Sequence, residues 1–358
     1  MFLGKPPTFA GGFLFLPMNP NKAVILINTG SPDSPDVNDV RTYLREFLGD
    51  PYVINMPWLL RKLLVNGIIA PIRGPRSAKL YRKIWTNQGS PLIVNSFKFA
   101  DKLASRLEHD YHVYVAMRYG NPSLENCISD ISKKDYRQVI AIPLYPQYAD
   151  STTGTILAET NRLIKKYRIS ADIINLDPFF STSAFINAFG EKIIRSKPSA
   201  FDHMIFSFHG LPVKQTERMH PGKTCLEANC RNEYNDLNRN CYYASCYATA
   251  RLLAGATGLN NNDYTVSFQS RLGMNWLKPY TDTILQQKAS EGAKKVLICS
   301  PSFVADCLET IHELGIEYKE LFMQYGGEEL TLIESLNDDP LWVEGMERLI
   351  RNLPQSAL

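Results

Sequence analysis

Long hydrophobic runs are missing from this sequence. None of its segments approaches the ~20 unbroken apolar residues that a membrane-spanning helix needs. The apolar run at 13–16 is too brief for a secretory signal peptide and lacks a basic leader. We therefore expect a cytoplasmic protein.

An excess of charge of either sign is missing as well. Lysine and arginine number 39 against 36 aspartates and glutamates, for a net charge of +3. With 21% charged and 44% hydrophobic residues, the composition is ordinary for a soluble protein and gives no reason to expect a nucleic-acid partner. The 358 residues exceed one ordinary domain of ~100–200 residues, so we predict two domains.

Short apolar runs alternate with helical patterns along both halves of the chain. The longer runs are continuously apolar, which is typical of strands that are covered on both faces in a parallel sheet. The pattern predicts an α/β protein with two doubly wound domains and one cleft between them. The predicted strands are 23–28, 112–117, 138–144, 171–176, 203–208, 264–267, 295–300 and 330–333.

The sequence predicts two domains followed by a short C-terminal segment. We expect an N-terminal domain at 1–175, a C-terminal domain at 176–335, and a C-terminal helix and tail at 336–358. The first domain includes an apolar segment at 53–90, and the second includes a cysteine-rich insertion at 220–247.

Residues 53–72 carry many apolar side chains that are interrupted by proline, glycine and arginine. A pair of core helices is the plainest interpretation. The alternatives are a lip around a pocket for an apolar ligand and a surface that rests on a membrane. If the segment borders a pocket, Arg73, Arg76 and Lys79 are placed to meet carboxylates of the ligand.

A histidine stands where the predicted strand at 203–208 ends. His209 is followed at once by Gly210 and then by Pro212, which break the strand. In open parallel sheets, ligands bind beyond the carboxyl ends of the strands, so His209 is the first candidate for a catalytic base. A histidine that serves structure alone is the alternative.

Four acidic residues follow the predicted strand at 295–300. Their spacings of three, four and four residues predict that they share one face of a helix. The row is either a solvated acidic face or a path for a divalent metal ion, with Glu309 innermost. The four are Asp306, Glu309, Glu313 and Glu317.

Seven cysteines are an odd number, and four of them crowd into one polar segment. Their C-x4-C-x10-C-x4-C spacing favours a metal site of four thiolates over a disulfide framework. Because the segment has too few apolar groups to fold by burial, a metal would hold it together. Structural zinc and an iron–sulfur cluster both stay open. The four are Cys225, Cys230, Cys241 and Cys246.

A series of motifs runs in order along the chain. They are NTGSP at 28–32, YRKIWT at 81–86, MRY at 117–119, PLYPQY at 143–148, SFHGLP at 207–212 and FQSR at 268–271. Together they resemble the ferrochelatases, enzymes that insert Fe²⁺ into a porphyrin. The resemblance extends over residues 22–350.

This resemblance implies two Rossmann-like domains of the chelatase type, with parallel four-stranded sheets and a porphyrin bound in the cleft between them. It implies insertion of Fe²⁺ into protoporphyrin IX to form protoheme, the terminal step of heme biosynthesis. The alternative within the class is a coproporphyrin III ferrochelatase or another tetrapyrrole metal chelatase. The alternative of another class is a non-catalytic protein that binds a tetrapyrrole or senses iron.

The resemblance also implies roles for individual residues. His209 and Glu309 match the catalytic histidine and glutamate of the family, one for proton abstraction and the other for the metal. Cys307 stands where many relatives have a histidine, which leaves a metal-relay role there in question. The implied porphyrin contacts are Tyr81, Ser90, Arg118, Tyr119, Trp276 and Phe303, and the implied iron path includes Asp306, Cys307 and Glu313.

The cysteine insertion is similar to one found in some bacterial ferrochelatases, directly after the histidine motif. That similarity implies a [2Fe-2S] cluster, with zinc as the alternative. The C-terminal tail, which supplies cluster cysteines in other members, has none here. The expected partners are a porphyrin and Fe²⁺ without nucleic acid, a peripheral membrane contact is a further expectation, and the oligomeric state stays open.

Overall fold

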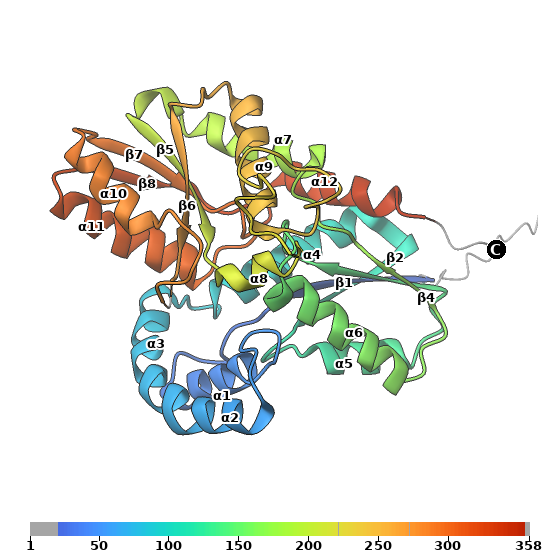
Figure 1. Cartoon of the computed structure of the whole chain (residues 1–358). Helices are drawn as coiled ribbons and strands as arrows, with labels where there is room; N and C mark the ends of the chain where they lie inside the picture. Colours follow the sequence, from blue (N-terminus) through green and yellow to red (C-terminus); the bar gives the residue numbers. More distant parts are fainter. Residues whose placement is uncertain (1–20, 221, 272, 355–358) are drawn as a thin grey trace, which may run out of the picture.

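Two four-stranded sheets organise the chain, one in each half (Figure 1). The computed structural model describes residues 21–354 except 221 and 272, so the apolar run at 13–16 and the end of the tail lie outside the described residues. The first sheet contains β1 (Lys22–Asn28), β2 (Tyr111–Met117), β3 (Gln138–Pro143) and β4 (Asp172–Asn175). The second contains β5 (His203–His209), β6 (Tyr264–Gln269), β7 (Lys295–Cys299) and β8 (Glu329–Leu332).

The two sheets have the same strand order. The first runs β2-β1-β3-β4 and the second β6-β5-β7-β8, and every paired strand is parallel. All eight predicted strands are confirmed, with ends shifted by one or two residues. The central strands β1, β3 and β5 are almost completely buried, which explains why their sequences are continuously apolar.

Twelve α-helices are present among the described residues, and several of them pack on the faces of the sheets. The twelve are α1 (Val37–Leu48), α2 (Trp58–Leu64), α3 (Ala70–Ile84), α4 (Pro91–Leu107), α5 (Leu124–Ile131), α6 (Thr155–Lys166), α7 (Ser183–Arg195), α8 (Val213–Glu217), α9 (Tyr242–Thr257), α10 (Thr281–Ser290), α11 (Tyr318–Gln324) and α12 (Pro340–Arg351). Three π-helical segments are η1 (Val65–Ile69), η3 (Asp150–Gly154) and η5 (Glu309–Glu317). Among the described helices, none is long and apolar enough to cross a membrane.

The helical segment from α2 to α3 departs from the plainest prediction. A pair of core helices would bury its large side chains, but six of them are more than half exposed. They are Trp58, Leu59, Leu60, Leu63, Ile68 and Ile72. The interpretation as a core pair is therefore wrong for this face, and α3 contributes a small core, around Ala78, against α1.

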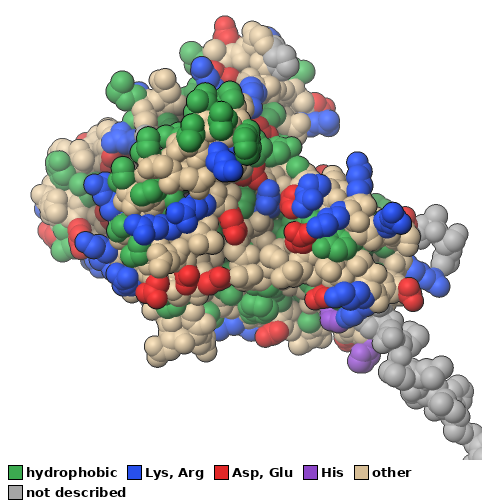
Figure 2. Space-filling model, turned by 90° about the horizontal axis from the view of Figure 1, so that it is seen from below, with side chains coloured by type: hydrophobic (Ala, Val, Ile, Leu, Met, Phe, Trp, Pro, Cys, Tyr) green, Lys and Arg blue, Asp and Glu red, His purple; other side chains and the backbone are tan. Residues whose placement is uncertain are grey.

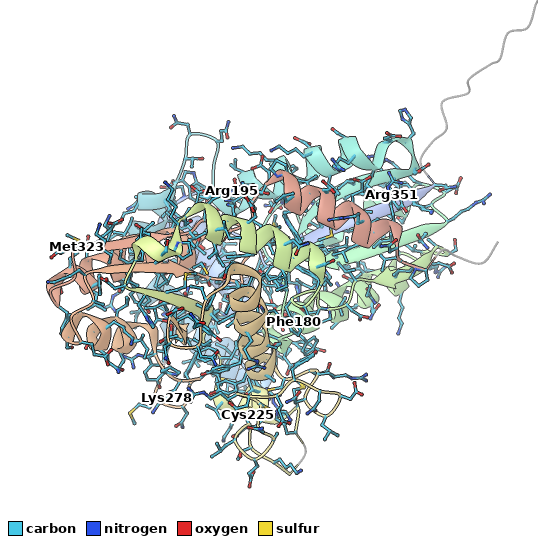
Figure 3. All side chains as sticks on the ribbon, turned by 90° about the horizontal axis from the view of Figure 1, so that it is seen from above. Phe180, Arg195, Cys225, Lys278, Met323 and Arg351 are labelled. Carbon is cyan, nitrogen blue, oxygen red and sulfur yellow. The ribbon has the colours of Figure 1, made fainter. Side chains whose placement is uncertain are left out.

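One hydrophobic core connects the two halves. It contains Leu26 of β1 and Ile142 of β3 together with Phe206 of β5. α7 and α12 lie side by side over it (Figure 3), and α12 also packs against α4 of the first half. The C-terminal helix thus joins the two halves into one packed unit, and Trp342 in its first turn is fully buried.

The strand order also fixes where a ligand site can form. In the first sheet β2 and β3 lie on opposite sides of β1, and in the second β6 and β7 lie on opposite sides of β5. At such a reversal of strand order, the connecting helices pass to opposite faces of the sheet, and a crevice opens beyond the carboxyl ends of the strands. These crevices lie at the ends of β1 and β3 in one half and of β5 and β7 in the other.

We expect Trp342→Ala to destabilise the whole molecule by about 3–5 kcal/mol, because it removes a large buried side chain from the shared core. The ring of Trp342 lies 5.8 Å from that of Phe99 and 5.4 Å from that of Phe179. Urea unfolding followed by circular dichroism tests this, with the half-exposed neighbour in Leu341→Ala as the control. Two transitions, only one of them shifted, would show that the halves do not share a core.

Candidate active site and metal centre

A single cavity of about 1530 Å³ opens at the carboxyl ends of both sheets. It is larger than the ~300–1,000 Å³ of ordinary ligand pockets, so it has room for a macrocycle. Asn28 and Tyr145 contribute from the first sheet, and His209 and Phe303 from the second. The predicted cleft between two lobes is therefore present.

The turn after β1 requires glycine. Gly30 has φ +115°, and a Cβ there would lie 1.9 Å from the carbonyl oxygen of Tyr119. The turn places Thr29 against Tyr145, whose phenol oxygen accepts from the Thr29 N–H at 3.0 Å. Burial raises the pKa of Tyr145, so the phenol stays protonated at the floor of the cavity.

His209 is the last residue of β5 and is held by its backbone. Its N–H donates to Ser302 Oγ at 3.2 Å, and its carbonyl oxygen accepts from the Tyr242 hydroxyl at 2.9 Å. Its ring meets that of Phe303 edge to face at 6.1 Å. Burial lowers the pKa of His209, while the charge of Glu309 opposes that shift. The imidazole is therefore neutral and able to accept a proton at neutral pH.

Glu309 begins η5 and lines the same cavity. Gln269 at the end of β6 fixes the start of this helix, because its Nε2 donates to the Glu309 carbonyl oxygen at 3.2 Å. Gln269 is itself held by Ser207, whose hydroxyl donates to Gln269 Oε1 at 2.7 Å. The second sheet thus positions both His209 and Glu309.

A row of carboxylates continues along η5. Glu309, Glu313 and Glu317 all line the cavity, and the wide turn of a π-helix keeps every fourth residue on one face. Glu313 Oε1 accepts from the Ser270 N–H at 2.7 Å and from the Tyr318 hydroxyl at 2.9 Å. Burial raises the pKa of Glu313 to about 7.

Asp306 does not belong to this row, contrary to the predicted helix face. Residues 303–307 form a loop, and Asp306 is not among the residues that line the cavity. Its carboxylate accepts from Asn337 Nδ2 at 2.7 Å and from the Ser335 N–H at 3.0 Å. Asp306 thus joins two loops of the second half.

Cys307 lines the cavity beside Glu309 but is a poor metal ligand as it stands. Burial and the negative charge of Glu309 both raise its pKa, so the thiol stays protonated.

The apolar walls contain four of the six predicted porphyrin contacts. Tyr81, Ser90, Trp276 and Phe303 line the cavity. Gly210 permits the close approach of Trp276, since a Cβ on Gly210 would lie 3.4 Å from its ring and 2.7 Å from the Gln269 carbonyl oxygen.

Arg118 and Tyr119, the other two, lie elsewhere. They line a second cavity of about 590 Å³ and are absent from the residues around the first. The Arg118 guanidinium forms an ion pair with Asp50 at 2.5 Å, and the Tyr119 hydroxyl donates to the same carboxylate at 2.9 Å. The structure therefore does not bring them together with His209.

Two cavity residues were not anticipated from the sequence. Tyr43 of α1 donates to the Gly30 carbonyl oxygen at 3.1 Å. His312 lies between Glu309 and Glu317 on η5, is buried, and has an Nε2 without a partner among the described residues. Helical spacing from Glu309 was the one signal that pointed toward His312.

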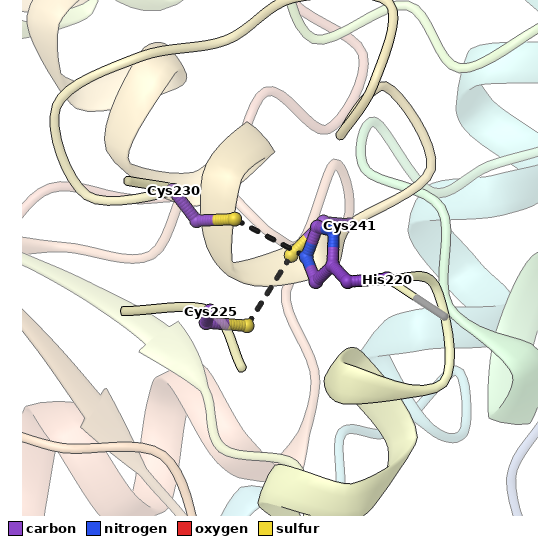
Figure 4. Close-up of side chains that lie close together, drawn as sticks. All are labelled: His220, Cys225, Cys230 and Cys241. Carbon is purple, nitrogen blue, oxygen red and sulfur yellow. Dashed lines mark hydrogen bonds between the residues drawn. The ribbon is translucent and has the colours of Figure 1, made fainter. Parts of the chain in front are cut away.

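The cysteine insertion gathers three of the four predicted thiols. Cys225, Cys230 and Cys241 meet together with His220, and their ligand atoms all lie within 4.8 Å of one another (Figure 4). Cys246 is not in this group. Thiolates and imidazole suit zinc and iron–sulfur centres, so the donor set fits a metal.

The comparisons with known proteins agree with this arrangement. The fold is that of the two-lobed chelatases: SirB from Bacillus subtilis with Fe³⁺ superposes with a TM-score of 0.54 at 10% identity, covering 92% of this chain and 94% of that chain. The same enzyme from subspecies spizizenii, a sirohydrochlorin chelatase in complex with cobalt, gives a TM-score of 0.52 at 9% identity over the same shares of the two chains.

The relatives by sequence are more specific. The ferrochelatase of Ectopseudomonas mendocina (strain ymp) is 41% identical over 340 residues, 93% of this chain and 98% of the relative. The ferrochelatase of Pseudomonas aeruginosa (strain LESB58) is 41% identical over 330 residues, which are 91% of this chain and 96% of the relative. The sequence model of the ferrochelatase family matches residues 21–353. The chain belongs to the ferrochelatase family.

Glu313 predicts a pH dependence of stability. Its folded pKa of about 7 lies above the ordinary 4.5, so the folded state holds the proton more tightly, and its stabilising effect at acid pH is lost as pH rises toward 7. The loss over this window is on the order of 3 kcal/mol. Glu313→Gln should gain stability relative to wild type across that window in urea titrations, and the exposed control Glu317→Gln should not. If stability changed with pH in the same way in all three proteins, the raised pKa of Glu313 would be contradicted.

Proposed function

We propose that this chain inserts Fe²⁺ into protoporphyrin IX to form protoheme, the terminal step of heme biosynthesis. The observation that carries the proposal is the single cavity in which a neutral, buried His209 shares space with the carboxylate row that begins at Glu309. A free-base porphyrin must lose two pyrrole protons and accept a dication. One group must therefore take protons, and another must present the metal.

His209 fits the proton acceptor. Because burial keeps its imidazole neutral, no proton has to leave it before it can act as a base. Once protonated, the imidazolium is stabilised by the nearby carboxylate of Glu309, since the two groups attract each other. The pair can therefore remove a pyrrole proton without leaving an uncompensated charge in an apolar cavity.

The carboxylate row fits the delivery of Fe²⁺. The Glu317 side chain is 61% exposed at the outer end, and Glu313 and Glu309 follow inward along η5. Oxygen ligands can replace the water of an incoming dication one step at a time. His312 lies beside this path, with Nδ1 3.9 Å from a Glu317 carboxylate oxygen.

The cavity walls fit a porphyrin with anionic side groups. Tyr81, Trp276 and Phe303 offer flat apolar surface to the macrocycle, and Arg73 and Arg218 at the rim are able to meet propionates. Coproporphyrin III, with more propionates, is the alternative substrate. Insertion rates for both porphyrins distinguish them, and an absence of turnover with either would favour a non-catalytic tetrapyrrole-binding or iron-sensing protein.

We propose that the cysteine insertion holds a metal centre. The similarity of this insertion to that of some bacterial ferrochelatases supports a [2Fe-2S] cluster, and zinc is the alternative. When bound, either would cross-link a polar segment that has little apolar surface to bury. The seven cysteines are all free in the structure, which supports a reducing, cytoplasmic location. Iron with acid-labile sulfide, measured against zinc in the purified protein, distinguishes the two centres.

We also propose that α2, η1 and the start of α3 rest on a membrane surface. Figure 2 shows hydrophobic side chains gathered on the face seen from below, with lysine and arginine side chains around them. The six exposed apolar side chains of this segment form the patch, and Lys62 lies 4.9 Å over the Trp58 ring. Ile69 and Arg73 of the same segment line the cavity, so the patch adjoins its mouth.

His209→Ala should lower kcat for iron insertion by about 10²–10⁴-fold, the usual cost of losing a general base. The matched control is His203→Ala, which removes a buried histidine from the other end of β5. We expect the control to keep near wild-type turnover per folded molecule. Equal activity of His209→Ala and wild type would refute the assignment of the base.

The acid limb of the kcat/KM profile should lie below the ordinary histidine pKa of ~6.5, because burial lowers the pKa of His209. Activity would then be retained at the ordinary histidine pKa and lost only as pH falls through the lowered pKa of His209. A limb above the ordinary value would indicate that a different group accepts the proton.

The double variant Leu59→Ser/Leu63→Ser should weaken binding to vesicles of phosphatidylcholine and phosphatidylserine at least about tenfold, since each leucine buries side-chain area in the lipid interface. Leu226→Ser/Leu237→Ser, which changes two exposed leucines of the insertion, serves as the control. Co-sedimentation measures both. An unchanged partition of the first variant would exclude this surface.

A further inference from the structure

We propose that His220 is the fourth ligand of the metal centre in the insertion, and that Cys246 is not a ligand. The proposal rests on the metal centre proposed above and changes its donor set from four thiolates to three thiolates and one imidazole. Its donor spacing also identifies the ion that fits best, a single tetrahedral ion such as Zn²⁺.

The contacts inside the group already resemble coordination. Cys225 Sγ lies 3.7 Å from Cys241 Sγ, and Cys230 Sγ lies 3.2 Å from His220 Nε2 (Figure 4). Two sulfurs bound tetrahedrally to one zinc at ~2.3 Å are about 3.8 Å apart, which matches the first distance. In a two-iron cluster the four ligands divide between two metals, so ligands on different irons lie further apart than the 4.8 Å within which all four donor atoms lie here. The compact group therefore favours one ion.

The helix geometry explains why Cys246 is left out. Cys241 is the N-cap of α9, and Cys246 lies five residues further along the helix. At 3.6 residues per turn, five residues rotate a side chain by about 140°, so the two thiols leave the helix in nearly opposite directions. Cys246 is fully buried in the shared core, which also contains Tyr247 and Ala250.

His220 is held where the fourth ligand must stand. It follows α8, where its N–H donates to the Glu217 carbonyl oxygen at 2.9 Å and its own carbonyl oxygen accepts from Lys223 N–H at 2.9 Å. Its side chain is buried within the insertion. Two neighbours contact the sulfurs: Asn238 Nδ2 donates to Cys230 Sγ at 3.6 Å, and the Thr216 hydroxyl oxygen lies 3.6 Å from Cys225 Sγ.

The site also touches the porphyrin cavity. His220, Thr224 and Glu227 all line it. The metal centre therefore fixes part of the cavity wall, and a loss of metal should raise KM for porphyrin more than it lowers kcat.

The test compares the metal content of His220→Ala, His220→Cys and Cys246→Ala with wild type, all purified as full-length protein without added metal. Inductively coupled plasma mass spectrometry gives zinc and iron per chain, and a colorimetric assay gives acid-labile sulfide. Cys225→Ala is the positive control for ligand loss. Circular dichroism reports whether each variant folds.

We expect one zinc per chain in wild type and in Cys246→Ala. In His220→Ala and Cys225→Ala, metal retention in a chelator competition should fall by more than the ~10–100-fold that follows loss of an outer-shell partner. His220→Cys should restore retention, because a thiolate replaces the imidazole. This rescue keeps the proposal testable even if His220→Ala folds poorly.

Loss of metal from Cys246→Ala with retention in His220→Ala would overturn the ligand assignment, and so would equal retention in both. If the protein contained iron and acid-labile sulfide and lost both in His220→Ala, the assignment of His220 as a ligand would be supported, and the proposal of a single metal ion would be overturned. Iron insertion into porphyrin, assayed on the same samples, reports separately on the proposed function, because metal content does not depend on turnover.

Discussion

The burial of His209 opposite Glu309 is the interaction on which the rest of this structure depends. In the proposed function, His209 is the base that works on a pyrrole nitrogen, and such a base must be neutral before it acts and tolerated as a cation afterwards. Burial provides the first condition by lowering the pKa of His209, and the adjacent carboxylate provides the second. The second sheet positions both residues: His209 ends β5, and Gln269 of β6 donates a hydrogen bond to the backbone of Glu309 at the start of η5. The first sheet contributes the opposite wall, and the shared core around Trp342 holds the two sheets at a fixed distance.

Much of the fold could be predicted because its determinants are local. Strands such as β1 and β3 are buried on both faces, so their sequences are continuously apolar and recognisable without a partner. The position of His209 at the cavity could be predicted for the same reason, because Gly210 and Pro212 end the strand directly after it. Glu309 and Glu313 were found from helical spacing, which a π-helix preserves closely enough.

The rest of the site depends on partners far away in the sequence, which spacing cannot reveal. Arg118 follows a strand end as predicted, but Asp50 draws it into a separate cavity. Asp306 has the spacing from Glu309 that would place both on one helix face, yet the chain is not helical at Asp306. Its carboxylate accepts a hydrogen bond from Asn337 instead. Cys246 fits a repeated x4 gap, but the gap crosses the start of α9 and turns the thiol toward the core.

The most direct test of the central claim is the pKa of His209 itself, followed by NMR of ¹⁵N-histidine-labelled protein with His209→Ala to assign the signal. The account predicts a pKa below the ordinary ~6.5 in wild type, and a still lower value in Glu309→Gln, because the charge that favours the imidazolium is removed. A pKa at or above the ordinary value, or no response to Glu309→Gln, would contradict it.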